Sequence, residues 1–348
     1  MDILQVSLLK PFFQHCNIKI DLQKAKILSK KIVRAFAPGA ISSFFEICKT
    51  KPDGKVLTDL QYVGARGGGF GLQLGVHTKV TIEDASENSI QITINNRVAP
   101  EARVTQNVTQ TILNKTAKKY AVTVEHQIDV PISMGFGTSA GGALTTGLAL
   151  KEALNLPLTF NQIGEIAHLA EIQLQTGLGT VSSLTMGGGL ILVTEPGMPG
   201  ICKIDRIPIN PDYVIVAGFY NTTIPKTIIS SENKNNINHY GKVTLTNILK
   251  NPCLESFLSN CWLFAQKTGF ASKRVYELVN LAMQTGAIGA AQNMIGEAVH
   301  VVVLKENAPA IVDAFKQVLP KEQVLTCKID FQGVRLIGNN REKEEETV

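Results

Sequence analysis

The sequence has little charge, few aromatic residues and no closely spaced cysteines. Charged residues make up 18% of its 348 residues, aromatic residues 6% and hydrophobic residues 44%. A chain this apolar can fill sizeable cores, so its composition is that of a globular protein and excludes a disordered one. Its length favours two domains.

Metal clusters and disulfide frameworks are not indicated. The six cysteines include no Cys-x-x-Cys pair, and the six histidines form no His-x-x-x-His or His-x-Glu pattern. We therefore expect no structural zinc, no protein-ligated transition metal and a location in the reducing cytoplasm. His126 alternates with Val122 and Val124, so it is expected to be a half-buried strand residue.

Membrane and nucleic-acid partners are not indicated either. No apolar run is long enough to cross a bilayer, and no basic region precedes an apolar run at the N-terminus, so neither a membrane protein nor an exported one is expected. The formal net charge is only +5, and no run of Lys and Arg is interleaved with aromatic residues. A weakly basic protein of this kind suits an anionic small-molecule substrate. The basic residues clustered near the start of the chain, expected to form a solvated face, are Lys24, Lys26, Lys30, Lys31 and Arg34.

The most informative segment spans residues 131–142, where glycines recur without any charge and lead into a helix-forming stretch. Glycines let backbone N–H groups approach an anion closely, and the first turn of a helix adds unpaired N–H groups and the positive end of its dipole. The segment therefore predicts a phosphate-binding loop. Thr138 and Ser139 stand at the start of the helix, where either hydroxyl could cap the helix, contact a phosphate or bind Mg²⁺.

Two other interpretations of this segment stay open. A phosphate loop ending in Gly-Lys-Ser/Thr is excluded because no lysine follows the glycines. Residues 137–141 do satisfy the Gly-x-Ser-x-Gly pattern of a hydrolase, in which Ser139 would be the nucleophile. A hydrolase needs a strand directly before this serine, whereas Pro131 and Gly135 favour a loop. The segment could also be a plain glycine-rich turn. Partners for a hydrolase, in the expected chain order, would be Asp205 or Asp212 and His239 or His300.

The pattern along the chain predicts a β-rich first half and an α+β second half. A strand at 32–37 is expected to turn at Pro38-Gly39 and return at 44–48, and the polar stretch 230–236 is expected to be a surface loop. The expected organisation is an N-terminal extension over 1–30, one domain over 31–200, a second over 201–338 and a disordered charged tail over 339–348. Other expected strands are 72–82, 89–94, 120–128, 187–194, 213–219, 298–304, 324–329 and 334–337, and other expected helices are 102–117, 140–154, 160–175, 243–249, 255–267, 273–284 and 308–318.

Together with three other segments, the glycine loop resembles the GHMP kinase superfamily. The first family motif is matched by residues 37–39 with Glu46, and the second, Pro-x-x-x-Gly-Leu-Gly-Ser-Ser-Ala, by residues 131–140 with Phe136 and Thr138 as substitutions. The C-terminal glycine motif is matched loosely by residues 286–289 and Gly296. The resemblance implies an α+β fold of two domains: an N-terminal α/β domain of the ribosomal protein S5 domain 2-like type and a C-terminal ferredoxin-like α+β domain.

Within the superfamily the chain most resembles archaeal pantoate kinase. The matching segments are 36–39, 44–46, 64–69, 135–139, 176–179 and 294–296. The resemblance implies transfer of the ATP γ-phosphoryl group to the 4-hydroxyl of pantoate, a step towards coenzyme A in archaea. A related kinase for homoserine, mevalonate or shikimate, and a catalytically silent ATP-binding relative, are the alternatives. The resemblance also implies a homodimer.

The resemblance assigns roles to individual residues. Ser139 and Glu171 take the positions of Mg²⁺ ligands, although Glu171 could equally be an exposed helical carboxylate. Thr180 stands where many relatives have an aspartate that accepts the substrate proton, and Ala40 where relatives often have a cationic or histidine side chain. A threonine cannot act as a base near neutral pH, but a loose phosphoryl-transfer transition state does not require full deprotonation first. The residues expected to bind ATP are Pro131, Gly135, Phe136, Gly137, Thr138, Ser139, Ala140 and Gly141.

A substrate carboxylate calls for a fixed cation, and Arg66 is the candidate. It lies in the segment Gly64-Ala65-Arg66-Gly67-Gly68-Gly69, where the glycines leave room for a guanidinium to bind a carboxylate through two hydrogen bonds. The same segment could instead form a loop on the phosphate or adenine side with Arg66 pointing to solvent. Glu46, Ser42 and Ser43 are candidates for binding the substrate hydroxyls.

Overall fold

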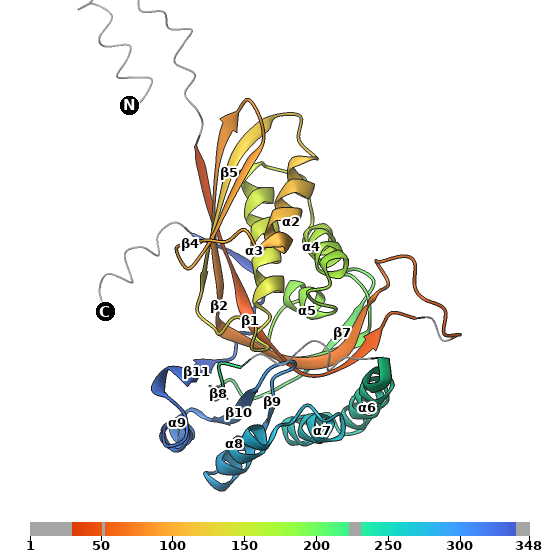
Figure 1. Cartoon of the computed structure of the whole chain (residues 1–348), viewed down its shortest axis with the longest axis vertical. Helices are drawn as coiled ribbons and strands as arrows, with labels where there is room; N and C mark the ends of the chain where they lie inside the picture. Colours follow the sequence, from red (N-terminus) through yellow and green to blue (C-terminus); the bar gives the residue numbers. More distant parts are fainter. Residues whose placement is uncertain (1–29, 51–52, 223–230, 339–348) are drawn as a thin grey trace, which may run out of the picture.

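The computed structural model describes residues 30–50, 53–222 and 231–338. Within these residues the chain forms an eight-stranded sheet and a four-stranded sheet, each accompanied by its own group of helices (Figure 1). The mixed α+β fold expected from the sequence is confirmed. The expected disordered tail and all but the last residue of the expected N-terminal extension lie outside the described residues.

The larger sheet is built around two long antiparallel strands, β1 and β2. Its order is β12-β1-β2-β5-β3-β4, while β6 pairs with β2 and β7 pairs with β6. Its strands are β1 (Lys31–Cys48), β2 (Gly64–Ala85), β3 (Ser89–Ile94), β4 (Arg97–Val98), β5 (Lys119–Ile128), β6 (Leu190–Glu195), β7 (Lys203–Ile207) and β12 (Arg335–Ile337).

The prediction of a turn at Pro38-Gly39 is wrong, because β1 continues through both residues. Ala37 pairs with Val76 and Gly39 with Leu72, so the register with β2 shifts between Pro38 and Gly39. Such an irregularity accommodates a residue that has no N–H to donate to the ladder. The Pro-Gly pair therefore bends a strand here instead of ending it.

The alternative of a loop at residues 64–69 is also wrong, because these residues begin β2. A Cβ on Gly69 would lie 1.7 Å from the Ile41 carbonyl oxygen, and one on Gly67 would lie 2.5 Å from that of Phe44. These glycines therefore serve a close approach of two paired backbones. They place Arg66 on a strand, where its position is fixed by the ladder.

Four helices cover one face of the larger sheet (Figure 1). The central one, α3, packs on β1 and β2 and is flanked by α2 and α4. It is buried on almost all sides, which explains its run of small and apolar residues without polar alternation. These helices are α2 (Arg103–Leu113), α3 (Thr138–Ala153), α4 (Phe160–Leu174) and α5 (Thr180–Thr185).

The smaller sheet and a second group of helices lie below β1 and β2 (Figure 1). Of these helices α8 and α9 pack on the smaller sheet, whereas α6 and α7 contact β1 directly. One apolar core includes Phe44 and Phe70 of the larger sheet together with Phe257 and Phe264 of α7, so the two halves of the chain share buried contacts. The sheet order is β11-β8-β10-β9. The remaining elements are β8 (Tyr213–Phe219), α6 (Ser231–Lys250), α7 (Leu254–Lys267), α8 (Lys273–Gln284), β9 (Gly289–Gln292), β10 (Ala298–Leu304), η3 (Lys305–Asn307), α9 (Ala308–Lys316), η4 (Lys321–Gln323) and β11 (Val324–Lys328).

The surface loop expected at 230–236 is wrong from Ser231 onward, because α6 begins there. Residue 230 lies outside the described residues. Asn238 of α6 accepts a hydrogen bond from the Ile47 N–H and donates one to the Ile47 carbonyl, and Ile237 is fully buried. Packing against β1 therefore outweighs the low helix propensity of this asparagine-rich stretch.

Most expected strands and helices are confirmed, with shifted ends in several cases. The short elements β4, α5, β7 and β9 were not predicted, because each offers too few residues for a periodic signal. The boundary expected near residue 200 stays a prediction. We note that β7 and β12 follow this position in the sequence and still pair within the larger sheet.

Candidate active site

A cavity of about 1410 Å³ lies beside the paired strands β1 and β2. It is also lined by residues of the loop that precedes α3, the first turn of α3, the end of α4, the start of α5 and the turn that follows β9. The glycine-rich segment and Arg66 therefore face one shared space, although about seventy residues separate them in the sequence.

The loop that leads from β5 into α3 depends on glycine at two positions. Gly135 and Gly137 have φ angles of +77° and +65°, and a Cβ on Gly137 would lie 2.9 Å from side-chain carbons of both Ala40 and Thr180. Phe136 between them is buried and accepts a hydrogen bond from the Ala40 N–H through its carbonyl. The loop is therefore pinned to β1 and keeps its backbone close to the cavity.

The N-terminus of α3 is open towards the cavity. Gly137 is the N-cap residue, and no side chain among the described residues caps the helix. Thr138, Ser139 and Ala140 all line the cavity, and Ser139 is exposed there. The first intrahelical bond joins Gly141 N–H to the Gly137 carbonyl. The N–H groups before it and the positive end of the helix dipole can thus bind an anion.

Ser139 and Glu171 meet at this helix start. The Ser139 hydroxyl donates a hydrogen bond of 2.5 Å to Glu171 Oε1, and the Thr176 hydroxyl donates another of 2.7 Å to the same oxygen. Glu171 is only 3% exposed, so the alternative of a solvent-exposed helical carboxylate is wrong. A Cβ on Gly177 would lie 2.0 Å from Glu171 Oε2, and a glycine is therefore needed for the carboxylate to occupy this position.

Thr180 opens α5 next to the glycine-rich loop that precedes α3. It lines the cavity, and its methyl group lies against Gly137. The position is therefore close to the start of α3. Ser183, one turn later, also lines the cavity, and its hydroxyl donates a hydrogen bond to the Thr180 carbonyl.

Arg66 and Glu46 are directly opposite each other on β2 and β1 and form an ion pair of 3.2 Å between Arg66 Nε and Glu46 Oε2. Burial raises the pKa of Glu46, an effect that the positive charges of Arg66 and Lys242 oppose without cancelling. Burial also acts to lower the pKa of Arg66, but the nearby Cys48 side chain and the charge of Glu46 outweigh this and leave the pKa raised. Arg66 lines the cavity, so a permanent positive charge stands in its wall.

The remaining predicted site residues divide into those that line the cavity and those that do not. Ser42 lines it, whereas Ser43 is fully buried and bonded to His300. Pro131 and Gly141 belong to the loop and to the helix but do not line the cavity, and Gly141 instead allows α3 to approach Val76 of β2.

The arrangement does not fit a serine hydrolase. The segment before Ser139 is a loop and not a strand, and the partner of Ser139 is Glu171. His300 lies in a separate buried network with Ser43 and Asn293. The interpretation of the segment as a plain glycine-rich turn explains the packing of Gly141. It does not explain the open start of α3 or the buried carboxylate of Glu171 beside it.

Sequence reasoning missed several residues in the cavity wall. Thr176 follows Glu171 by five positions at the end of α4, and only the turn at Gln175, with φ of +56°, brings its hydroxyl back to the carboxylate. Nothing in the local pattern marks that contact. Basic side chains that also line the cavity and were not predicted are Lys49, Arg97 and Arg103.

The described residues offer neither a cluster of metal ligands nor a helix suited to a membrane. No group of three or more His, Cys, Asp and Glu side chains is placed to hold a metal ion within residues 30–50, 53–222 and 231–338. Over the same residues, no helix combines the length and the apolar character that crossing a membrane requires.

Comparison with known proteins gives consistent relatives. The GHMP kinases N terminal domain matches residues 103–188. The chain is 31% identical over 277 residues to the pantoate kinase of Methanocaldococcus jannaschii, covering 78% of this chain and 93% of the relative. A solved structure described as a phosphotransferase related to the CoA biosynthesis pathway aligns with a TM-score of 0.76 at 26% identity, covering 88% of this chain and 99% of that one. Mevalonate diphosphate decarboxylase from Staphylococcus aureus shares the fold, with a TM-score of 0.67 at 15% identity over 89% of this chain and 99% of that one.

Proposed function

This chain belongs to the pantoate kinase family of the GHMP kinases, and we propose that it transfers the γ-phosphoryl group of ATP to the 4-hydroxyl group of pantoate. The products are 4-phosphopantoate and ADP. The bond between the γ-phosphorus and its bridging oxygen breaks, a bond between that phosphorus and the pantoate oxygen forms, and the hydroxyl proton is released. The enzyme is thus an ATP-dependent phosphotransferase with an alcohol acceptor.

The observation that carries this proposal is the open start of α3 beside the Ser139–Glu171 pair. An open helix N-terminus reached by a loop with two left-handed glycines suits the triphosphate of ATP. Because phosphoryl transfer needs mainly positioning and neutralisation of charge, backbone N–H groups at this point supply what the reaction requires. Pro131, Gly141 and the residues between them form the proposed ATP-binding segment.

The donor set fits Mg²⁺. This ion prefers oxygen ligands and keeps several waters, so one carboxylate and one hydroxyl are sufficient protein ligands. Glu171 and Ser139 provide them, 2.5 Å apart at the helix start. When bound there, Mg²⁺ supplies positive charge for the phosphate oxygens.

The acceptor is proposed to bind between Thr180 and Arg66. Both line the cavity, and Arg66 is held by Glu46 on the neighbouring strand. A fixed guanidinium suits the carboxylate of pantoate, with Ser42 and Glu46 as further partners for its hydroxyl groups. Thr180 is proposed to contact the transferred group without acting as a base, since a threonine hydroxyl keeps its proton near neutral pH.

The test is ADP release by the purified protein with Mg-ATP and, in parallel reactions, pantoate, homoserine, mevalonate or shikimate. Release with pantoate alone is expected. Release with another alcohol would replace the proposed acceptor, and measurable ATP binding without release for any of them would indicate a catalytically silent relative. Reaction of Ser139 with a serine-directed phosphonate in the absence of ATP would instead support a hydrolase.

The remaining proposals follow from the family. We expect a homodimer, which sedimentation of the purified protein tests. We place the reaction in the cytoplasm, where ATP is the common phosphoryl donor.

A further inference from the structure

A fully buried histidine connects two segments that reach the cavity wall. His300 of β10 lies between Ser43 of β1 and Asn293, the residue after β9. Its Nε2 is 3.0 Å from the Ser43 hydroxyl and its Nδ1 is 2.8 Å from the Asn293 amide oxygen. All three side chains have no exposed surface. This network is therefore part of the interior and does not itself touch a ligand in the cavity.

The partners determine the protonation of the ring. The Asn293 oxygen can only accept, so His300 Nδ1 carries the ring proton and its N–H donates the hydrogen bond. Nε2 is then the acceptor for the Ser43 hydroxyl. Burial lowers the pKa of His300 to about 3, so the ring is neutral at physiological pH and both hydrogen bonds persist.

Asn293 begins a tight turn, residues 293–296, that lies against the phosphate-binding loop. The Gly135 Cα lies so close that a Cβ there would be 3.0 Å from Asn293 Cβ, and a Cβ on Gly296 would be 2.8 Å from the Met134 carbonyl oxygen. Met294 lines the cavity, and its N–H donates to the Ser42 carbonyl. The turn thus contacts both β1 and the loop before α3.

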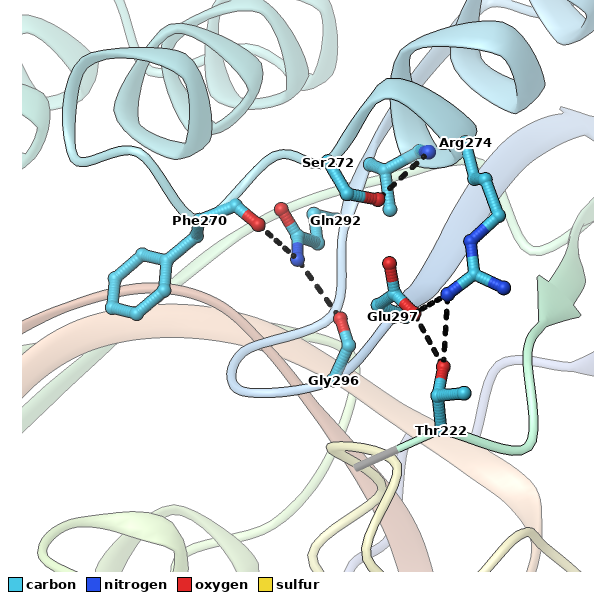
Figure 2. A network of polar contacts seen from close by, with 8 residues as sticks. Thr222, Phe270, Ser272, Arg274, Gln292, Gly296 and Glu297 are labelled. Atoms are coloured by element: carbon cyan, nitrogen blue, oxygen red, sulfur yellow. Dashed lines mark hydrogen bonds and ion pairs between the residues drawn. The ribbon is translucent and has the colours of Figure 1, made fainter. Parts of the chain in front are cut away.

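The other end of this turn is held by a different side chain. Gln292 Nε2 donates to the Gly296 carbonyl at 2.9 Å and to the Phe270 carbonyl at 3.1 Å (Figure 2). Next to it, Glu297 pairs with Arg274 and accepts from the Thr222 hydroxyl (Figure 2). The Gly296 end is therefore held by Gln292, next to the ion pair that Glu297 makes with α8. At the Asn293 end the main chain bonds to Ala298 and to Ser42, and His300 holds the Asn293 side chain.

We propose that His300 is a positioning residue that, through its Nδ1–H bond to Asn293, holds the 293–296 turn against the phosphate-binding loop in the geometry that nucleotide binding requires. The inference rests on the proposed function in one respect, namely that the loop before α3 binds the phosphates. It adds a role for a residue outside the cavity. A shift of the turn displaces Gly135, and small displacements of a positioned group are costly in phosphoryl transfer.

The test compares two replacements of the same ring. His300→Leu removes both hydrogen bonds, whereas His300→Asn places an amide donor near the position of Nδ1 and can keep the bond to Asn293. We expect His300→Leu to weaken binding of a fluorescent, non-hydrolysable ATP analogue roughly tenfold or more, as displacement of a positioned group does. His300→Asn is expected to bind within a few-fold of the parent protein. Ser43→Ala, which removes only the Nε2 contact, should behave like His300→Asn.

The matched control is His168→Leu. His168 of α4 is another buried histidine, 1% exposed, and it does not line the cavity. It should lower the melting temperature without changing analogue affinity. The proposal would be overturned if His300→Leu bound the analogue as tightly as the parent protein does. It would also be overturned if His300→Asn and Ser43→Ala bound the analogue at least tenfold more weakly than the parent protein. If His300→Leu does not fold, the analogue affinities of His300→Asn and Ser43→Ala can still contradict the proposal.

This readout also separates the inference from the proposed reaction. Analogue binding is measured without pantoate, so failure of pantoate phosphorylation leaves the test of His300 intact. Failure of the parent protein to bind the analogue would contradict the proposed nucleotide site and, with it, this inference.

Discussion

The hydroxyl of Ser139 at the start of α3 donates a hydrogen bond of 2.5 Å to Glu171 Oε1 near the end of α4. The two residues are 32 positions apart, and the contact exists because α4 packs beside α3 on the same face of the larger sheet. Ser139 is exposed in the cavity while the carboxylate is buried behind it.

Glu171→Gln is expected to weaken activation by Mg²⁺. The amide keeps the shape of the side chain but loses the charge, so the Mg²⁺ concentration that gives half-maximal ADP release should rise about 100-fold or more, given that even outer-shell partners of a metal contribute 10–100-fold. Glu165→Gln on the same helix, outside the cavity, is the control. An unchanged Mg²⁺ requirement would exclude Glu171 as a ligand.

Gly177→Ala should reproduce much of the Glu171→Gln defect by displacing the carboxylate. The new Cβ would lie 2.0 Å from Glu171 Oε2, so the carboxylate must move away from Ser139. Gly179→Ala is the matched control, because its Cβ would lie 3.4 Å from the nearest atom, an ordinary contact. Full activity of Gly177→Ala at low Mg²⁺ would show that the position of Glu171 does not matter.

Arg66→Met is expected to raise the KM for pantoate far more than the KM for ATP. Removing a charge-assisted hydrogen bond of about 1.5–3 kcal/mol corresponds to roughly tenfold to 150-fold in KM. Lys79→Met serves as the control, since Lys79 lies on the same strand and pairs with Glu125 outside the cavity. Equal effects on both KM values, or none, would refute the assignment of Arg66 to the substrate carboxylate.

Thr180→Val tests whether the hydroxyl has a chemical role. Valine keeps the branched shape that packs against Gly137. We expect kcat to fall less than about tenfold, whereas loss of a general base costs about a hundredfold to ten-thousandfold. The dependence of kcat on pH should also be unchanged. A hundredfold loss with an altered pH profile would assign the hydroxyl a part in proton transfer.

Folding stability should decrease in mild acid because of His126. Burial lowers its pKa to about 4 from the ordinary 6.5, so between these values the unfolded chain binds a proton that the folded chain excludes. Its contribution is complete above about pH 6.5 and is lost as the pH falls towards 4. From pH 6.5 to 5 this amounts to about 2 kcal/mol in the free energy of unfolding.

Urea denaturation should show that the free energy of unfolding falls less between pH 7 and 5 in His126→Gln than in the parent protein. His239→Gln, which changes an exposed histidine in α6, should lose as much as the parent protein. An unaltered slope in His126→Gln would contradict the proposed cause.

His126 also illustrates where sequence reasoning stops. Alternation with valines predicted its strand correctly, and the residue does lie in β5. Its burial is greater than expected, because Thr78 and Thr105 approach its two ring nitrogens from β2 and α2. Those partners lie 48 and 21 positions away, and a local pattern contains no information about them.

Proline and glycine gave the clearest errors in the fold. Pro38-Gly39 and the glycines of residues 64–69 have the composition of turns, yet they lie in the two longest strands. In isolation such residues favour turns, because they disfavour regular strands. In this fold an irregularity of the strand accommodates the missing N–H of the proline, and the missing Cβ of the glycines allows two backbones to approach closely. Both features depend on the partner strand.

The sequence by itself determined the kind of protein and located the glycine-rich loop for which phosphate binding is proposed. Glycines before α3 allow the positive φ angles that this loop adopts at Gly135 and Gly137, a property of the residues themselves that the sequence shows directly. The tertiary structure alone decided that Glu171 is buried against Ser139, that Arg66 is held by Glu46 in the wall of the same cavity, and that Ser43 belongs to His300 and not to the cavity. Each of these contacts joins residues distant in the chain, and such pairs are brought together by the pairing of strands and the burial of apolar surface.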